Sequence, residues 1–564
     1  MAYDLVIRNG SVVDGSGEAA YRADIGVEGG RIRTVGRIPA GERATREIDA
    51  DGLTVTPGFI DPHTHLDAQM FWDHAGANSC WHGVTTAVMG NCGFTIAPGS
   101  EAQADLIVRN LERAEDMSAA VLAAGIDWSW TTYPEYLDTL DRLPKGINYI
   151  AQVGHSAVRC HVMGERAFHE EATAEELALM ERHVRDAITS GAWGFTTSRT
   201  KNHLTPAGDP VASRVAAWSE IERLLDVASD AGAIVYQYVE DPPKGPDARL
   251  EHEEMLFALS AKTGLSFVIP TMGPAEMVFS LLDRAAAAGA SFIGVNHPRG
   301  IGNWSSFKNR MPFDAVPEWA AIRSQPLEQQ RAVLLDPDRR AALVTAALNH
   351  TYAVNVGAEA RPPDYDHMRV MTGPTPPWPT VNEVAAQRGL DPVSTIIELS
   401  LESDFDHFFV QRFGNVDMDN SARLIAHPSI VTGFSDSGAH VSQMADASIT
   451  SHLLAHFVRE RQLVPLEAAV RSMTGSIATK WGIAERGFIR EGYVADLNVL
   501  DPDTVGPAMP AMRNDLPADG QRIEQRSTGY RATIVAGAVL IDDGEYTGAH
   551  PGALLRRGRA SVKG

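Results

Sequence analysis

The chain has 564 residues, of which 44% are hydrophobic and 21% charged, a composition that is ordinary for a globular protein and excludes a disordered one. Its formal net charge of -23 would repel nucleic acid and anionic membranes, and no basic run offsets that charge. Three cysteines are too few for a disulfide framework, and neither a signal peptide nor a membrane-spanning apolar stretch is visible. We therefore expect a cytoplasmic protein with no nucleic-acid or membrane partner.

Both ends of the chain have the pattern of short β-strands. Residues 1–56 have the pattern of short strands separated by turn residues. The same pattern recurs within residues 485–564, in "GFIREGYVADLNVLD" and "YRATIVAGAVLIDDGEYTG". Two β-rich ends around a different middle predict one small composite β-sandwich domain formed by both termini.

The middle, residues 57–484, alternates apolar strand-like runs with amphipathic helical stretches. Strands that are apolar throughout indicate a parallel sheet covered on both faces. Eight runs of this kind fit a distorted (β/α)8 TIM-type barrel, so the predicted fold class is α/β. The runs are residues 55–63, 84–92, 148–156, 192–198, 233–239, 265–272, 291–297 and 429–436.

A helical and loop insertion is predicted at about residues 299–428, because the gap before the last strand is too long for one helix. An insertion after strand 7 would emerge at the catalytic face of a barrel, where it could act as a lid. Its aromatic residues suggest an apolar acyl or aryl pocket, although core packing is the commoner use of such residues. They are Trp304, Phe307, Trp319 and Trp378.

The first barrel strand ends in "PGFIDPHTHLDAQ", residues 57–69, with His63 and His65 two positions apart. Side chains two apart on a strand point to the same face, so both imidazoles can converge on one point while Thr64 faces away. Imidazole is the commonest protein ligand for zinc and similar ions. The motif therefore favours a metal site, and the alternative is a hydrogen-bonded histidine pair.

Other reactive residues fall at the ends of later strands. The second strand ends in "MGNCG" with Cys92, the third in "GHS" with His155, and the eighth in "GFSDSGAH" with Asp436 and His440. The carboxyl ends of barrel strands share one face, so these metal ligands and proton carriers are expected to meet there.

With these motifs in order, the chain resembles the amidohydrolase superfamily, and within it the N-acyl-D-amino-acid deacylase (D-aminoacylase-like) branch. The resemblance runs almost end to end. It implies a composite β-sandwich with a distorted barrel, a divalent metal that is usually zinc, and hydrolysis of an amide. The motifs that carry it are "VTPGFIDPHTHLD", "HGVTTAVMGNCGFTIAP", "GHSAVR", "GFSDSGAH", "RGFIREGYVADLNVLD" and "RATIVAGAVL".

By the same resemblance, His63 and His65 are metal ligands, Asp436 is both a metal ligand and the general base, and Cys92 is a metal-bridging thiolate. A bound metal lowers the pKa of water and polarises the scissile carbonyl. Asp436 would take the proton from water and deliver it to the departing amine. For Cys92, packing as a small buried hydrophobe is the alternative.

The sequence departs from the family pattern on strands 5 and 6, where the resemblance implies one metal-binding histidine each. Here the strands read "AIVYQYVEDPP" and "LSFVIPTMGP", without histidine. One zinc held by His63, His65 and Asp436 is therefore favoured; two ions, or another divalent metal, remain possible. His297 in "VNHPRG" is either a replacement ligand or a rim residue that contacts solvent or substrate.

Arginines are the candidates for binding a substrate carboxylate, because the planar guanidinium matches it. Arg159, Arg199 and Arg299 all follow strand ends, and each could instead pair with a structural acid. His155 either orients the substrate carbonyl as a catalytic residue or holds the barrel rim. With His297 and His440 these arginines are the predicted substrate-binding residues. Lys201, past strand 4, is out of register for a metal-bridging carboxylated lysine and is expected in a loop.

The leading hypothesis is a metal-dependent hydrolase of a non-peptide C–N bond, acting on an N-acyl-(D-)amino acid or a related small amide. A cyclic-amide or other small-amide hydrolase is the alternative enzyme, since strands 5 and 6 reshape the pocket. A catalytically silent scaffold is the alternative outside enzymes. We expect a small-molecule partner and a homo-oligomer, because symmetric dimers are the commonest assembly.

Overall fold

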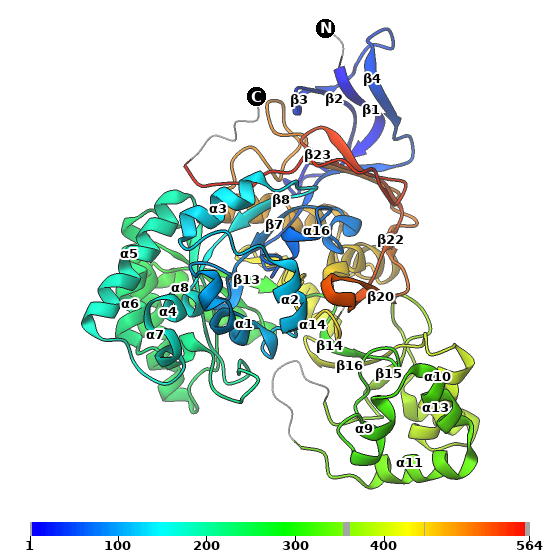
Figure 1. Cartoon of the computed structure of the whole chain (residues 1–564). Helices are drawn as coiled ribbons and strands as arrows, with labels where there is room; N and C mark the ends of the chain where they lie inside the picture. Colours follow the sequence, from blue (N-terminus) through cyan, green and yellow to red (C-terminus); the bar gives the residue numbers. More distant parts are fainter. Residues whose placement is uncertain (1–2, 354–360, 445, 559–564) are drawn as a thin grey trace.

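The structure is a computed structural model that describes residues 3–353, 361–444 and 446–558. Figure 1 shows three regions: a β-sheet that carries both ends of the chain, a central α/β body, and a lobe formed by the insertion. The sheet and the lobe lie at opposite ends of the central body.

The strands of both termini form one nine-stranded sheet, in the order β25-β24-β23-β18-β5-β1-β2-β3, with β4 paired to β1. β18 joins the two ends of the chain, because it pairs antiparallel with β5 on one side and with β23 on the other. A shared sheet agrees with the predicted composite domain, and its form as a sandwich stays a prediction. The strands are β1 Tyr3–Val12, β2 Tyr21–Glu28, β3 Arg31–Gly36, β4 Ala44–Asp49, β5 Thr54–Pro57, β18 Leu497–Leu500, β23 Tyr530–Val535, β24 Ala538–Asp542 and β25 Glu545–Tyr546.

Each of the eight predicted apolar runs contains a strand of the central body, and the third contains two. Their pairs are parallel, in the orders β6-β7-β8 and β17-β13-β12-β11-β10-β9. The strands are β6 Phe59–Asp61, β7 Val84–Met89, β8 Asn148–Ala151, β9 Val153–Gly154, β10 Gly194–Arg199, β11 Val235–Glu240, β12 Ser266–Pro270, β13 Ser291–Asn296 and β17 Ile430–Thr432.

The expected barrel is not closed by a ladder between β17 and β6 in the part of the chain that the structure describes. Pro62 follows β6 and has no N–H to donate, and it packs so closely on Gly433 that a Cβ there would lie 2.2 Å from the Pro62 ring. Two backbone bonds span the gap beyond it, from His65 N to Ser437 O (2.8 Å) and from Asp436 N to His63 O (3.3 Å). The first and last strand ends are thereby tied together.

Side chains from successive strands fill the interior of the central body, as parallel buried strands require. They include Ile60, Val88, Ile150, Val235, Val268, Ile293 and Val431, all buried in one cluster. Several outer helices begin at capping boxes, for example Thr132 with Glu135 before α3 and Thr173 with Glu176 before α5. The α-helices of the body are α1 Ala104–Glu112, α2 Ala119–Gly125, α3 Tyr133–Arg142, α4 His155–Met163, α5 Ala174–Ser190, α6 Trp218–Asp230, α7 Pro246–Thr263, α8 Ala275–Ala287, α14 Met418–Ala426, α15 Ile449–His452, α16 Leu466–Met473 and α17 Gly475–Trp481.

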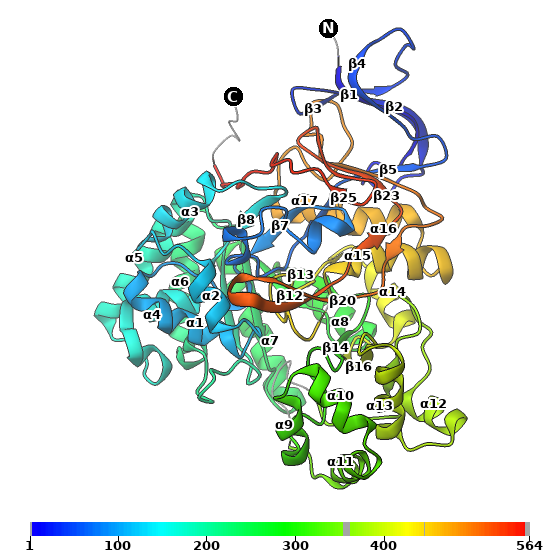
Figure 2. The same cartoon turned by 45° about the vertical axis from the view of Figure 1, so that its right-hand side comes forward.

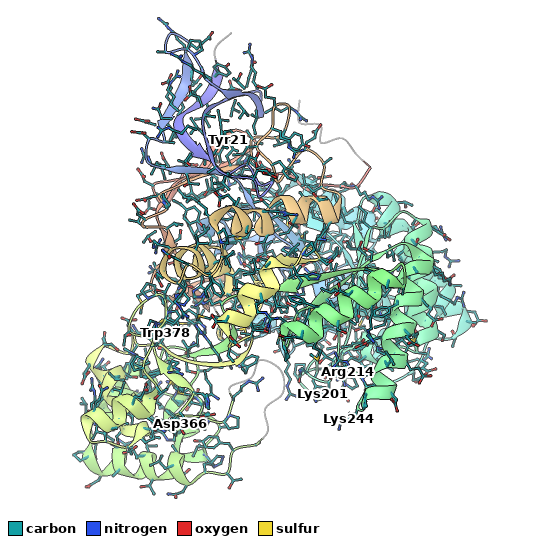
Figure 3. All side chains as sticks on the ribbon, turned by 180° about the vertical axis from the view of Figure 1, so that it is seen from behind. Tyr21, Lys201, Arg214, Lys244, Asp366 and Trp378 are labelled. Atoms are coloured by element: carbon teal, nitrogen blue, oxygen red, sulfur yellow. The ribbon has the colours of Figure 1, made fainter. Side chains whose placement is uncertain are left out.

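The insertion forms a lobe with a core of its own, which includes Phe307 and Trp319, while Trp304 and Trp378 pack in a second small cluster. All four aromatic residues are buried, so core packing, and not a substrate pocket, is the use that the structure shows for them. Figure 3 shows Trp378 and Asp366 on this lobe. Its elements are β14 Ile301–Ser305, α9 Pro317–Arg323, α10 Leu327–Leu335, α11 Pro337–Asn349, β15 Met368–Val370, α12 Val381–Arg388, α13 Pro392–Glu402 and β16 Phe409–Gly414.

A hairpin between β18 and β23 leaves the terminal sheet and lies against the loops of the central body (Figure 2). It consists of β20 Ala511–Leu516 and β21 Gly520–Glu524, and Ile523 N donates to Val441 O (2.7 Å), beyond β17. Arg522 pairs with Asp73 (3.3 Å), beyond β6. The hairpin thus borders the face where the predicted site residues lie.

Among the described residues, no helix is both long and apolar enough to cross a membrane. The cytoplasmic location stays a prediction.

Candidate metal centre

The backbone beyond β6 directs His63 and His65 to one side. Thr64 donates through its backbone N and its hydroxyl to Val88 O on β7, at 2.9 and 2.8 Å, so its side chain faces the neighbouring strand. His63 N is held by the carboxylate of Asp61 (3.2 Å). The two imidazole rings consequently lie with their centroids 5.5 Å apart, as the alternation of the strand predicts.

Three site residues have positive backbone φ angles, which non-glycine residues adopt rarely. The angles are 55° at Cys92, 49° at Asp436 and 49° at His440. Strained backbone of this kind persists where the surroundings hold it, and it concentrates at functional sites. One such restraint is Gln237, whose side-chain oxygen accepts a hydrogen bond from Cys92 N (2.6 Å).

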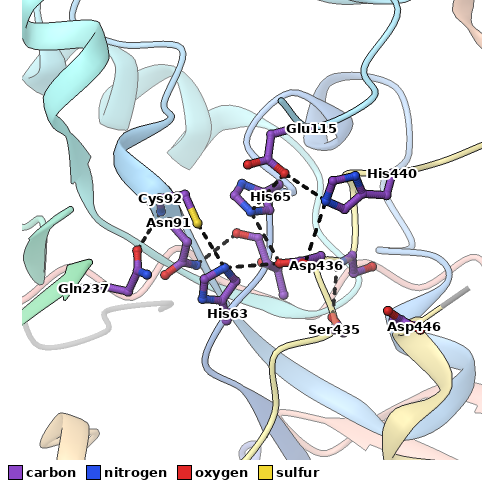
Figure 4. A network of polar contacts seen from close by, with 12 residues as sticks. His63, His65, Asn91, Cys92, Glu115, Gln237, Ser435, Asp436, His440 and Asp446 are labelled. Atoms are coloured by element: carbon purple, nitrogen blue, oxygen red, sulfur yellow. Dashed lines mark hydrogen bonds and ion pairs between the residues drawn. The ribbon is translucent and has the colours of Figure 1, made fainter. Parts of the chain in front are cut away.

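His63, His65, Cys92 and Asp436 converge, as Figure 4 shows. One ligand atom each from His63, His65 and Cys92 lies within 4.8 Å of the others, and Cys92 Sγ is 3.5 Å from His63 Nε2. Asp436 Oδ1 is 3.2 Å from His63 Nε2 and 3.6 Å from His65 Nε2. The structure therefore brings together all four residues predicted to hold a metal.

Glu115 and His440 extend this group on the side away from Cys92. Glu115 Oε2 lies 3.6 Å from His65 Nε2 and 3.3 Å from His440 Nε2, and His440 Nε2 lies 3.9 Å from Asp436 Oδ2. Glu115 was not predicted from the sequence, because it follows helix α1 and not a strand. Its position is fixed by tertiary contacts such as the bond from His440 N to Glu115 O (2.6 Å).

The electrostatics of the group follow from its burial. Burial alone would raise the pKa of Asp436, but the close imidazoles of His63 and His65 outweigh that effect and hold the pKa well below its usual value. Burial lowers the pKa of His65 and of His440, partly opposed by Asp436. Burial, helped by the charge of Asp436, raises the pKa of Glu115 well above its usual value. Asp436 is therefore ionised, and the neutral form is favoured for the imidazoles of His65 and His440; these are the forms that bind metals.

The donor set fits a divalent cation. Several buried polar atoms of the group have no hydrogen-bond partner: both ring nitrogens of His65, Nδ1 of His440 and Oδ1 of Asp436. Unpartnered buried polar atoms cost roughly 1–3 kcal/mol each, and a coordinated cation would remove that cost. Burial raises the pKa of the Cys92 thiol well above its usual value, and a coordinating metal deprotonates such a thiol. Imidazole, thiolate and carboxylate together are typical zinc ligands.

Strands 5 and 6 supply supporting side chains in place of the histidines that the resemblance implied. On β11, Gln237 holds the backbone of Cys92, while Tyr236 and Tyr238 stack on each other with ring centroids 5.2 Å apart. Beyond β12, the Thr271 hydroxyl donates to Val295 O (3.1 Å).

His155 and Arg159 form a separate buried cluster around Glu220. His155 Nδ1 pairs with the Thr197 hydroxyl (2.9 Å) and Nε2 with Glu220 (2.7 Å), so neither ring nitrogen is left for a substrate. Arg159 places its guanidinium on the same carboxylate at 2.6 Å and is fully buried. Of the two roles left open for His155, the structure favours holding the barrel rim, and Arg159 pairs with a structural acid.

Arg199, Arg299 and His297 also have protein partners. Arg199 donates to Ala216 O (2.7 Å) and lies over the Trp218 ring. Arg299 is buried, donates to Gln525 Oε1 (3.1 Å) and lies over the Trp304 ring, and burial lowers its pKa to about 9.

His297 is buried, so it does not contact solvent, and its Nε2 lies 3.1 Å from Asp446 Oδ2. It is not in the metal-ligand group that the structure forms from His63, His65 and Cys92 among the described residues. Lys201 lies exposed on the loop after β10, as expected (Figure 3).

Space for a ligand lies next to the group. A narrow cavity of about 20 Å³ is lined by Asp436 and His440. It shares Gln69, Gly438 and Val441 with a cavity of about 500 Å³. The apolar lining of the larger cavity comes mainly from Trp72, Met117, Val121, Leu122 and Leu516.

An α/β body with histidines, a carboxylate and a thiol at its strand ends defines a metal-dependent hydrolase, and comparison with known proteins identifies its family. The Amidohydrolase family matches residues 46–541, so the chain belongs to that family of hydrolases that act on C–N bonds other than peptide bonds. The chain is 28% identical to a D-aminoacylase of Alcaligenes xylosoxydans xylosoxydans over 570 residues, 98% of each chain. It is 28% identical to an N-acyl-D-glutamate deacylase of the same organism, over 100% of this chain and 98% of that one.

Among solved structures, the chain is similar to the N-acyl-D-glutamate deacylase of Bordetella bronchiseptica, which is complexed with zinc and a phosphonate inhibitor that mimics the tetrahedral intermediate. The identity is 26%, the TM-score is 0.65, and the similarity covers 99% of this chain and 100% of that one. Within the family, the chain therefore falls in the D-aminoacylase-like branch.

Proposed function

We propose that the protein hydrolyses the amide bond of an N-acyl-D-amino acid or a related small N-acyl amide, with a divalent metal held at the strand ends. The observation that carries the proposal is the convergence of Asp436 Oδ1, at 3.2 and 3.6 Å, on the Nε2 atoms of His63 and His65, beside the Cys92 thiol.

His63, His65, Cys92 and Asp436 would hold one zinc ion, which supplies Lewis-acid polarisation of the carbonyl and lowers the pKa of a water molecule. Asp436, which is ionised at neutral pH, would accept the proton of the attacking water as the general base. It then delivers that proton to the departing amine. His63, His65 and Cys92 are buried and the Asp436 side chain is only 16% exposed, which strengthens each electrostatic contact.

The substrate class is supported by the relatives, whose names state acyl-D-amino acids, and by the shape of the neighbouring space. An apolar acyl group fits the 500 Å³ cavity, since its walls include Trp72, Met117 and Leu122. The same cavity is continuous in its lining with the loop that carries Asp436 and His440, so the scissile bond and the acyl group would be neighbours.

The test is release of free amine from N-acyl derivatives of D- and L-amino acids, with and without a zinc chelator. We expect turnover of the D series that the chelator removes and added zinc restores. Opening of a cyclic amide with no turnover of either series would favour the alternative enzyme. No turnover of any amide by protein shown to contain zinc would contradict the proposal.

A further inference from the structure

The loop after β10, residues 200–216, carries a histidine that the proposed function does not use. The His203 ring packs on Phe94, with ring centroids 5.1 Å apart, and Phe94 in turn packs on His65, with centroids 6.5 Å apart. His203 Nδ1 pairs with the hydroxyl of Ser198 on β10 at 2.7 Å. His203 is thereby held one aromatic ring away from the metal group.

The partner of Nδ1 determines what the other ring nitrogen of His203 can do. Among the described residues, His203 Nδ1 is the one acceptor of the Ser198 hydroxyl, so the hydroxyl donates and the ring proton lies on Nε2. Burial, together with the charges of His440 and His65, lowers the pKa of His203 to about 3, so the ring is neutral. Within the described residues His203 Nε2 forms no hydrogen bond, and the side chain is only half-buried. It is therefore a donor that a ligand can reach.

Two arginines beside this loop have carbonyl oxygens, and not carboxylates, as partners. Arg214 donates to His203 O (3.0 Å) and Arg199 donates to Ala216 O (2.7 Å). In the part of the chain that the structure describes, neither guanidinium forms an ion pair, although the chain has 72 acidic and 49 basic residues. Burial lowers the pKa of Arg214, and the like charge of Arg199 adds to that effect while Asp241 opposes it. A guanidinium carries several N–H donors, so both arginines keep charge and donors for an anion.

The edge of the central body that carries this loop is positively charged. Figure 3 shows Lys201, Arg214 and Lys244 at that edge, and both lysines are exposed. Neither lysine forms an ion pair within residues 3–353, 361–444 and 446–558. A positive edge on a protein with a formal net charge of -23 favours the approach of anions to this place.

We propose that His203 Nε2 and the Arg214 guanidinium bind a carboxylate of the substrate, so that the loop of residues 200–216 selects acyl amides whose amine part carries a free carboxylate. This inference rests on the proposed function and narrows its substrate class. An imidazole N–H and a guanidinium both donate to carboxylate oxygens, and such charge-assisted hydrogen bonds are the strong ones. In an N-acyl amino acid a single carbon atom separates the amide nitrogen from the carboxylate. A carboxylate site close to the metal group suits that spacing.

The test is the kinetics of acetate release from an N-acetyl-D-amino acid and from the carboxamide of the same compound, with zinc-loaded protein. We expect the wild type to prefer the free carboxylate. In His203→Phe and in Arg214→Gln, kcat/KM for the carboxylate should fall roughly 10- to 100-fold, mainly through KM. The loss for the carboxamide should be smaller, so the preference for the carboxylate collapses.

Conservative variants and a control separate recognition from a structural role. His203→Gln can donate from about the position of Nε2, and Arg214→Lys keeps the charge, so each should retain more of the preference than H203F or R214Q. Arg185→Gln, an exposed arginine on α5, is the matched control and should behave as the wild type does. Zinc content, measured by elemental analysis, should be the same in all of these proteins.

An unchanged preference for the carboxylate in both H203F and R214Q would overturn the inference, and so would equal losses for both compounds together with loss of zinc. A wild type that hydrolyses both compounds equally well would overturn it and leave the proposed function standing. A zinc-containing wild type that hydrolyses neither compound would remove the proposed function and this inference with it. If one variant does not fold, as judged by circular dichroism, the other still decides the question.

Discussion

Glu220 lies between His155 and Arg159, at 2.7 Å from the imidazole and 2.6 Å from the guanidinium, and it engages both side chains. Burial alone would raise the pKa of Glu220, but its two partners lower that pKa to about 2. His155 contributes first to this lowering and Arg159 after it, while burial lowers the pKa of His155 itself.

We predict that Glu220→Gln lowers the free energy of unfolding by about 3 kcal/mol, because it leaves Arg159 buried without its counter-charge. Metal content should not change, since the cluster is separate from the metal group. Chemical denaturation and elemental analysis check the two statements. Loss of bound metal at unchanged stability would show instead that the cluster of Glu220, His155 and Arg159 supports the metal group.

The interaction of Glu220 with His155 and Arg159 also predicts that the stability of the protein falls at acid pH. The folded-state pKa of Glu220, about 2, lies below the ordinary value of 4.5, so its stabilising contribution is fully present above pH 4.5. It is lost as the pH falls from 4.5 through about 2. Denaturation of wild type and E220Q between pH 7 and pH 3 should show the difference in stability shrinking with acid. A constant difference would contradict this assignment.

Gln237→Ala should weaken metal binding by about 10- to 100-fold, the usual cost of removing a group that orients a ligand. The Gln237 side chain holds Cys92 N at 2.6 Å and so fixes the strained turn that presents the thiol. Competition with a chromophoric chelator measures the affinity. Gln411→Ala, on the inserted lobe, is the control, and an unchanged affinity in Q237A would exclude this positioning role.

Leu122→Trp should raise KM for long acyl groups and leave short ones little affected, because Leu122 lines the 500 Å³ cavity. The expected change is about 10-fold for a chain that fills the cavity, and kcat for the acetyl substrate should stay near that of the wild type. Measuring KM and kcat for N-acyl substrates of increasing acyl length checks this difference between long and short acyl groups. Equal losses for all lengths would place the acyl group elsewhere.

The fold was predictable from the sequence because buried parallel strands read as apolar runs, and each of the eight runs contains a strand. The convergence of the candidate ligands was predictable where they end those strands, as His63, Cys92 and Asp436 do. Glu115 was not, because a residue after helix α1 has no local signal of where tertiary contacts place it. His155 and Arg159 looked like site residues at a strand end, but Glu220, distant in sequence, engages both.

The missing ladder between β17 and β6 could not be predicted. The periodicity of the sequence does not report the close packing of Pro62 on Gly433 that accompanies it. The left-handed backbone at Cys92, Asp436 and His440 is also invisible in residue patterns, since none of them is glycine.

The most direct test of the account is metal content and amidase activity of the His63→Ala/His65→Ala double variant beside wild type and His367→Ala, all purified without added metal. Wild type and H367A should each retain at least one zinc per chain and hydrolyse an N-acyl-D-amino acid, and the double variant should lose both the zinc held at this site and the activity. A double variant that keeps the metal content and activity of the wild type, or a wild type that binds no metal even when zinc is supplied, would contradict it.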